Sequence, residues 1–377
     1  MTRIAIVLLI AASGVAAAAG NDDYRSYDFA CFWTGGRFVL EGRDLYDRAA
    51  WEQATRATAA RPAASGLVAD PCPGTFGYPL WTALALAPLG ALPITPAAAI
   101  WMSLNIAGAL AGLVLCWRAA RGPRRAALLY ATVVVFSLPF WRMLVLGQMS
   151  GILLGLAGAS AYLSGRGDER HGVALGAMIL KPQVAAIFGA IALLRAVRSQ
   201  RWRGIALAST VALLLAGASL AYDATWPVRW LSEVLGHRAD MVRGLPSVWG
   251  LAGELGEPLL ALPVLLLLGA AAWWLVRGSP IDDGRRAALL LPLGALVVPY
   301  FQSYDHLLLA LPWAYIARDA AALLPLARAT ALAGLVVCAS VLPWVLYAAA
   351  FPGRDSWNAL TPALTVLLLA ATTRVTR

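Results

Sequence analysis

The sequence predicts an all-α polytopic membrane protein, and three observations support this fold class. Hydrophobic residues make up 60% of the 377 residues and charged residues 13%, whereas soluble domains are about 45–50% apolar. The mean hydropathy is +0.70. The apolar runs reach the roughly 18–20 residues with which a helix crosses about 30 Å of hydrocarbon, and they are too long for the strands of a membrane barrel.

These runs predict about twelve transmembrane helices in a single domain, residues 1–377. The expected spans are 4–20, 78–93, 96–117, 126–140, 148–163, 172–194, 204–222, 258–277, 287–301, 305–317, 323–349 and 359–373. The first run has a basic start and an alanine-rich end, which also matches a cleaved signal peptide. We prefer an uncleaved first helix because many more spans follow, and either interpretation places residue 21 outside.

The arginines orient these spans. Two long segments, 21–77 and 222–256, are rich in tryptophan and charge, as is typical of helices at a membrane surface. They lie outside if four arginine clusters are cytoplasmic: 195–203, 277–286, 317–329 and the C-terminal "RVTR". The cluster at 117–125 disagrees, because the same count places it outside. Either the predicted span 78–93 does not cross and a later error compensates, or this loop breaks the rule.

Charge and cysteine usage narrow the function classes. The net charge of +10 comes from basic clusters between apolar runs, so the positive-inside rule explains it better than nucleic-acid binding does. No carboxylate lies in the middle of an apolar run and no internal repeat is visible, which argues against an ion-coupled transporter. Cys31 and Cys72 share one external loop and could pair in an oxidising compartment. We expect no metal site, since neither the cysteine spacing nor the pairs Asp22–Asp23 and Asp282–Asp283 supply one.

The segment "SYDFACFWTGGRFVLEGRDLYD", residues 26–47, predicts an interfacial helix. From Asp28, apolar residues recur at helical spacing, which would place one face in lipid. Gly42 is the expected C-cap. Taken alone, Asp28 is interpreted as an N-cap, because aspartate accepts hydrogen bonds from free backbone amides.

Five motifs in order resemble glycosyltransferase family 87. They are "YDFACFWTGGRFVLEGRDLYD", "FGYPLWTALALAPLGALP", "LGQMSGILLGL", "GVALGAMILKPQVA" followed by "RWRG", and "FQSYDHLLLALP". The resemblance covers roughly residues 20–315, with "GYPLW" and "SYDH" departing from the commonest pattern. It implies a GT-C fold like that of polyprenyl-phosphate-mannose-dependent mannosyltransferases. It also implies an external active site in which Asp28 is the general base.

That chemistry is consistent with the predicted location. Outside the membrane there are no nucleotide sugars, so the donor must be a sugar on a lipid phosphate. The acceptor hydroxyl must lose a proton as the new bond forms, and a positioned carboxylate would contribute about 10²–10⁴-fold to the rate. A single inverting displacement requires no metal or other cofactor, because cationic side chains can neutralise the departing phosphate.

Three cations could bind the donor phosphate: Lys181, Arg142 and Arg37. Lys181 is the only lysine and lies within a predicted span, where a charge needs a polar cavity or a partner unless it snorkels to the surface. Arg142 and Arg37 could equally be ordinary interfacial arginines. The candidate substrate-pocket residues are His306, Gln148, Gln183, Tyr304 and Tyr78. Each has a structural alternative: helix–helix hydrogen bonds for the glutamines, a capped helix start for Asp305 and His306, and interfacial placement for the tyrosines.

The sequence therefore predicts a multi-pass glycosyltransferase of the bacterial inner membrane with its active site facing outward. The expected reaction moves a hexose, with mannose first among the candidates, from a polyprenyl-phosphate donor to an extracytoplasmic glycolipid or glycan. Membrane lipids are the other expected partners. Two alternatives remain: a lipid-linked-sugar flippase, which should show repeats and midplane charges, and a surface-polysaccharide ligase, which should have a longer, more arginine-rich external loop.

Overall fold

The computed structural model describes residues 28–58, 72, 74–237, 242, 244–277, 281–350 and 355–375. The predicted first span, 4–20, and the pair Asp22–Asp23 lie outside these residues. The described residues are helical throughout, with no β-strand. They form two compact units: one consists of the described residues from 28 to 109 with 142–152 and 210–237, and the other consists of 110–141, 153–209 and the described residues from 242 to 375. We call them the first and second units.

The first unit contains four whole helices: α2 (Asp28–Leu40), α3 (Arg48–Thr58), α4 (Leu80–Gly90) and α12 (Trp226–His237). It also contains parts of α5 (Ile94–Ala120), α7 (Leu138–Leu146) and α11 (Arg203–Tyr222), and the first three residues of α8 (Ser150–Gly165). The second unit begins with the rest of α5, then α6 (Arg124–Val135), the rest of α8, α9 (His171–Ala177), η2 (Met178–Leu180) and α10 (Pro182–Ser199). It continues with α13 (Val248–Glu254), η4 (Pro258–Leu260), α14 (Ala261–Arg277), α15 (Asp283–Val297), η5 (Asp305–Leu309) and α16 (Ala310–Ala320). Its last elements are α17 (Pro325–Val336), η6 (Val337–Val341), α18 (Leu342–Ala350), η7 (Ser356–Ala359) and α19 (Leu360–Val375).

Helix α2 is surrounded by protein, which corrects the expected lipid-facing helix. Nine of its thirteen residues are buried, and Leu40 is its one exposed large apolar side chain. It packs along α4 and also contacts α3. The predicted end of the helix is confirmed, since Gly42 has the left-handed φ of +66° typical of a C-cap.

Two glycines make the close crossing of α2 and α4 possible. A Cβ on Gly36 would lie 2.4 Å from the carbonyl oxygen of Leu86, and a Cβ on Gly90 would lie 2.3 Å from the amide nitrogen of Arg37. Both distances are far inside van der Waals contact, so this crossing excludes any larger residue.

Three helices in the described residues are long and apolar enough to cross a membrane: α5, α11 and the continuous helix Pro325–Ala349. A fourth span exists if α6 and α7, which bend by 49° at their junction, count as one. The count of twelve therefore remains a prediction. The predicted span 78–93 is reduced to the 11-residue α4, which at about 1.5 Å per residue is only about 16 Å long.

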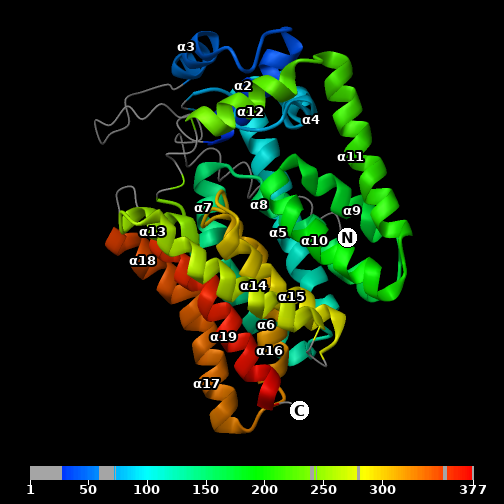
Figure 1. The fold of residues 1–377 in the computed structure, drawn as a ribbon, viewed down its shortest axis with the longest axis vertical. Coiled ribbons are helices and arrows are strands. Elements are labelled where there is room, and N and C mark those ends of the chain that lie inside the picture. Colours follow the sequence, from blue (N-terminus) through cyan, green and yellow to red (C-terminus); the bar gives the residue numbers. More distant parts are fainter. Residues whose placement is uncertain are drawn as a thin grey trace. The chain divides into compact units, whose positions relative to one another are not determined.

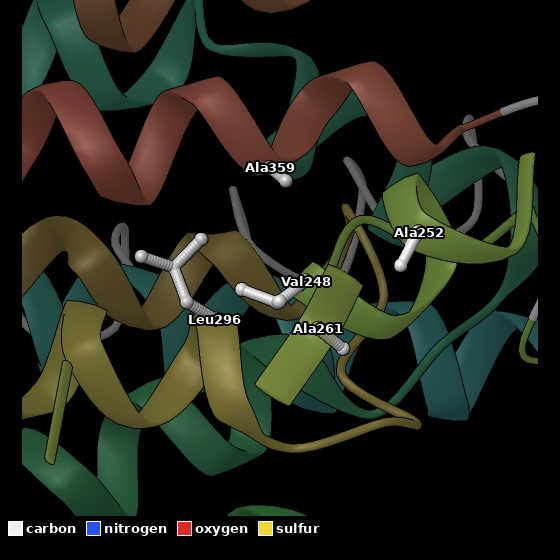
Figure 2. Packing of buried hydrophobic residues seen from close by; sticks show 5 residues of the cluster. All are labelled: Val248, Ala252, Ala261, Leu296 and Ala359. Atoms are coloured by element: carbon white, nitrogen blue, oxygen red, sulfur yellow. The ribbon is translucent and has the colours of Figure 1, made fainter. Parts of the chain in front are cut away.

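The second unit is built around α16, whose residues from Ala310 to Ala317 are all buried. Helices α6, α15, α17 and α19 contact it, and Figure 1 shows α17 and α19 running beside it. A separate apolar cluster joins α13, α14, α15 and η7. Figure 2 shows its five buried residues converging: Val248, Ala252, Ala261, Leu296 and Ala359.

Two helical hairpins organise the same unit. In the first, α9 and η2 lead to Lys181 and α10 returns. The amide of Gly204 donates to Glu169 Oε2 at 2.9 Å, which holds the two ends of this hairpin together. In the second, α15 runs out and η5 with α16 returns, and an ion pair of 2.7 Å between Arg285 and Asp319 joins its ends. The expected continuous span 172–194 is thus interrupted, because its halves run in opposite directions.

This geometry resolves the disagreement of the 117–125 loop. Arg118 and Arg121 line the same cavity as arginines of the loops near 195–203, 277–286 and 317–329. Arg318 also donates to the carbonyl oxygen of Ala120 at 3.0 Å. The loop therefore lies with the clusters predicted to be cytoplasmic. The short α4 and the hairpin at Lys181 are the two places where the structure departs from the predicted continuous spans.

Candidate active site

Lys181 lies at the tip of the first hairpin, and the local sequence explains why the helix breaks there. It precedes Pro182, and a residue before proline avoids the helical region. Lys181 accordingly has φ −130° and ψ 87°, and Pro182 is the first residue of α10. The carbonyl oxygen of Lys181 accepts from the amides of Val184 and Ala185, both at 3.0 Å. Helix α10 has 18 residues, so its axis extends about 27 Å from this tip to the arginine clusters.

The Lys181 side chain ends at a carboxylate inside the second unit. Its Nζ lies 2.6 Å from Asp305 Oδ1, and the two side chains are 1% and 0% exposed. The ammonium also lies 4.5 Å from the centre of the Tyr304 ring, a distance at which a cation–π attraction operates. The snorkelling alternative for Lys181 is therefore wrong, because the ammonium points into the protein and is paired there.

The loop from 298 to 304, the start of η5 and the start of α10 contain the other candidate residues near this ion pair in the sequence. Asp305 Oδ2 accepts from the amide of Gln302 at 3.3 Å, which fixes the carboxylate against its own turn. His306 is buried and stacks on Phe301 with ring centres 5.9 Å apart. Gln183, in the first turn of α10, is half-buried. The structure thus brings Lys181, Tyr304 and Asp305 together, and His306 follows Asp305 directly in the chain.

Other predicted site residues gather in the first unit. Asp28 begins α2 and is half-buried. The next residue, Phe29, lies against the Gly147 turn, where an added Cβ would be 2.6 Å from Phe29 Cβ. Gly147 has φ +68°, and the buried Gln148 follows it. The Trp101 indole donates to the Gly147 carbonyl at 2.6 Å. The "LGQ" motif thus packs against the start of α2, next to Asp28.

Tyr78 follows the first loop and packs against aromatic residues of α2 and of that loop. Its ring lies 5.2 Å from that of Phe32 and 5.8 Å from that of Phe76. The Tyr46 hydroxyl donates to its carbonyl oxygen at 3.1 Å. Burial raises the pKa of Tyr46 well above its ordinary value, so this hydroxyl stays a donor. Tyr78 therefore belongs to an aromatic wall beside α2.

The two candidate arginines lie elsewhere. Arg37 is in the last turn of α2, nine residues and about 13 Å along the axis from Asp28. It is exposed and paired with Glu41 at 2.6 Å, so the structure does not bring it to the Asp28 end. Arg142 lies half-buried in α7, near the start of the LGQ turn. Of the three predicted cations, Lys181 has the most enclosed environment.

Cys31 and Cys72 form a disulfide, which was left open by the sequence. It ties α2 to the far end of the first loop, where the indole of Trp51 also donates to the Cys72 carbonyl at 3.0 Å. Disulfides persist in oxidising compartments. In the part of the chain that the structure describes, no group of three or more potential metal ligands occurs. Asp282 caps α15, and Asp283 pairs with Arg286 at 2.6 Å.

Sequence reasoning missed the role of Asp305. It was considered only as the cap of a helix start, whereas the structure makes it the partner of Lys181, 124 residues away. The sequence contained one indication of this pairing. A buried lysine requires a nearby anion, and Asp305 in "SYDH" is a carboxylate at the end of a predicted span.

In the described residues these observations define an all-helical membrane protein with three or four candidate spans and a buried site that contains an ion pair and an aromatic ring. The model of glycosyltransferase family 87 matches residues 76–312. The chain belongs to this family, and it is therefore a membrane glycosyltransferase. The matched region contains Lys181, the 301–306 loop and Gln148, but neither Asp28 nor Arg37. Neither the curated proteins nor the solved structures include a match to this chain.

Proposed function

We propose that this glycosyltransferase moves a hexose, with mannose as the leading candidate, from a polyprenyl-phosphate donor to an extracytoplasmic glycolipid or glycan. The observation that carries the proposal is the buried Lys181–Asp305 pair at a hairpin tip. The tip is about 27 Å, nearly the thickness of the hydrocarbon, from the arginine clusters. A cation held there suits a lipid phosphate whose sugar lies at the outer surface.

In this mechanism each predicted site residue has its own role. Asp28 takes the proton from the acceptor hydroxyl as it attacks the anomeric carbon, with inversion and without metal. Lys181 stabilises the negative charge that develops on the departing phosphate, and Asp305 orients the ammonium. His306, Tyr304, Gln183, Gln148 and Tyr78 bind sugar hydroxyls or stack on the sugar ring. The Cys31–Cys72 disulfide supports placing the first loop outside an inner membrane.

The proposal also includes a GT-C fold with twelve spans, counted differently from the sequence expectation. In this count the segment 78–93 does not cross, and 172–194 makes two passages, of which the first, with the ten-residue apolar helix His171–Leu180, is shorter than a full span. All five arginine clusters then lie in the cytoplasm, and the hairpin tip with Lys181 points outward.

Transfer by the full-length protein in liposomes tests the reaction. The donors are synthetic polyprenyl-phosphate mannose, polyprenyl-phosphate glucose, polyprenyl-diphosphate hexose and GDP-mannose, with a membrane glycolipid extract as acceptor. We expect transfer from a monophosphate-linked hexose only, detected as a mass increase of one hexose. Transfer from the diphosphate donor alone would favour the ligase, and bilayer translocation of labelled donor without product would favour the flippase.

A further inference from the structure

The second unit contains an arginine-lined cavity at the opposite end of the hairpins from Lys181. Its volume is about 580 Å³. Seven arginines line it against two aspartates, a net charge of +5 with His171 neutral: Arg118, Arg121, Arg166, Arg195, Arg198, Arg286, Arg318, Asp282 and Asp283. The positive-inside rule accounts for arginines at this end of the spans, but not for their convergence on one cavity.

Ion pairing within the protein leaves much of this charge available. Asp283 lies 2.6 Å from Arg286 and 3.8 Å from Arg198, and Asp319 pairs with Arg318 at 2.7 Å. Among the described residues, the other four lining arginines make no ion pair: Arg118, Arg121, Arg166 and Arg195. A ligand that neutralises several of them must carry concentrated negative charge and several acceptor oxygens, as a phosphate group does.

The rest of the lining is apolar. Phe188, Ile191 and Leu194 come from α10, Leu290 from α15 and Leu311 from α16. An inorganic ion would leave these side chains facing water. A lipid phosphate would place its charged group among the arginines and its glycerol and first methylene groups against the apolar wall.

The backbone conformation of Arg121 is a second reason to expect a ligand in this cavity. Arg121 has φ +57°, in the left-handed region where glycine is favoured, and the following residue is Gly122. This conformation is unfavourable for a residue with a Cβ, so arginine is a less stable choice than glycine for ending α5. Gln200 closes α10 in the same way, with φ +55°, but it does not line the cavity.

We infer that this cavity binds the phosphate headgroup of an anionic membrane lipid. The site is separate from the sugar-transfer groups of the proposed function and does not depend on them.

The test uses two glycine substitutions that relieve the same backbone strain. Arg121→Gly removes a cavity charge, Gln200→Gly does not, and the combination Arg118→Gln with Arg121→Gly removes two charges. Binding of phosphatidylglycerol to the full-length protein in detergent is measured by native mass spectrometry and by thermal shift. Phosphatidylcholine and inorganic phosphate are the comparison probes.

We expect one saturable phosphatidylglycerol site. A charge-assisted contact corresponds to about tenfold or more in affinity, so Arg121→Gly should weaken binding about tenfold and the double variant further. Gln200→Gly should bind as the wild type does, and neither glycine variant should melt earlier without lipid. Unchanged binding in the double variant would overturn the inference. So would equal weakening by Gln200→Gly, equal binding of phosphatidylcholine, or displacement of the lipid by millimolar phosphate, which would indicate a site for free ions.

Discussion

Lys181 and Asp305 form a buried pair, so neither can be substituted alone without a second effect. Removing one partner leaves the other charge buried, which costs about 3–5 kcal/mol, whereas replacing both with neutral residues is often close to neutral. A loss of activity in Lys181→Met alone would therefore combine lost donor binding with lost stability. A test of the phosphate role must separate these two contributions.

The double variant Lys181→Met/Asp305→Asn makes that separation. We predict that Lys181→Met is poorly stable, that the double variant recovers thermal stability, and that both lose roughly tenfold to a hundredfold in donor kcat/KM. The acceptor KM should change little, and Lys181→Arg should retain part of the donor value. The measurement is kcat and KM for each substrate in liposomes. If the double variant regains donor kcat/KM within about twofold of wild type, the pair has only a structural role.

Asp28 has two interpretations that one substitution distinguishes. Asn keeps the side-chain oxygen that caps a helix but cannot accept a proton from the acceptor, so Asp28→Asn should fold normally and lose at least a hundredfold in transfer rate. The matched control is Asp47→Asn, since Asp47 Oδ1 accepts from the amide of Ala50 at the start of α3. Asp47→Asn should transfer at the wild-type rate. Retention of more than about a tenth of the rate by Asp28→Asn would leave the capping role alone.

At the level of elements, the α2–α4 crossing depends on the absence of side chains at Gly36 and Gly90. We predict that Gly36→Ala destabilises the protein by about 1–3 kcal/mol, since the new methyl group meets the Leu86 carbonyl in a packed crossing. Gly189→Ala, in α10, has open space around the added Cβ and should stabilise by about 0.5–1 kcal/mol. The two melting temperatures, measured in detergent, should shift in opposite directions. A Gly36→Ala variant that melts no earlier than wild type would show that the crossing is loose.

A second element-level feature is the π-helical turn η6 between α17 and α18. Pro343 follows it, and proline displaces the carbonyl of the preceding turn. The helix stays continuous, since Pro325–Ala349 is long and apolar enough for one span. The Trp344 indole donates to the Phe136 carbonyl at 3.1 Å, where α6 ends. The distorted turn and this contact between helices therefore both lie within a continuous helix that is a candidate span.

At the level of the whole molecule, the revised path of the chain predicts on which side each loop lies. Arg124→Cys and Arg201→Cys should react with a membrane-impermeant maleimide from one face of sealed vesicles, and Glu257→Cys from the other. The free native cysteines, Cys116 and Cys338, are buried and should give little background. Labelling of Arg124→Cys from the same face as Glu257→Cys would contradict the revised path, because an even number of crossings would then separate these two residues.

The proposed mechanism also predicts independence from divalent metal. Transfer should continue in excess EDTA, because Lys181 is expected to supply the positive charge at the departing phosphate. The measurement is the initial rate with and without chelator. Loss of activity that Mg²⁺ or Mn²⁺ restores would contradict the mechanism and point to ligands bound together with the substrate.

The sequence by itself determined the features that depend on local chemistry. Apolar runs predicted the helical class, the spacing after Asp28 predicted α2, and Gly42 predicted its end. Five ordered motifs predicted the family, because each motif is a short run of residues that can be recognised without knowledge of its three-dimensional contacts. "LKPQ" also contained the signal for the helix break, since a residue before proline leaves the helical region.

Only the tertiary structure decided what depends on long-range contacts. Burial of α2 in protein instead of lipid follows from the close packing of Gly36 against α4. The sequence pattern of an apolar helix face is the same whether that face contacts protein or lipid. The pairing of Lys181 with Asp305 and the return of the 117–125 loop to the other arginine clusters depend on two hairpins meeting. Residues more than a hundred positions apart become neighbours only when the chain packs. A single sequence does not indicate which distant residues these will be.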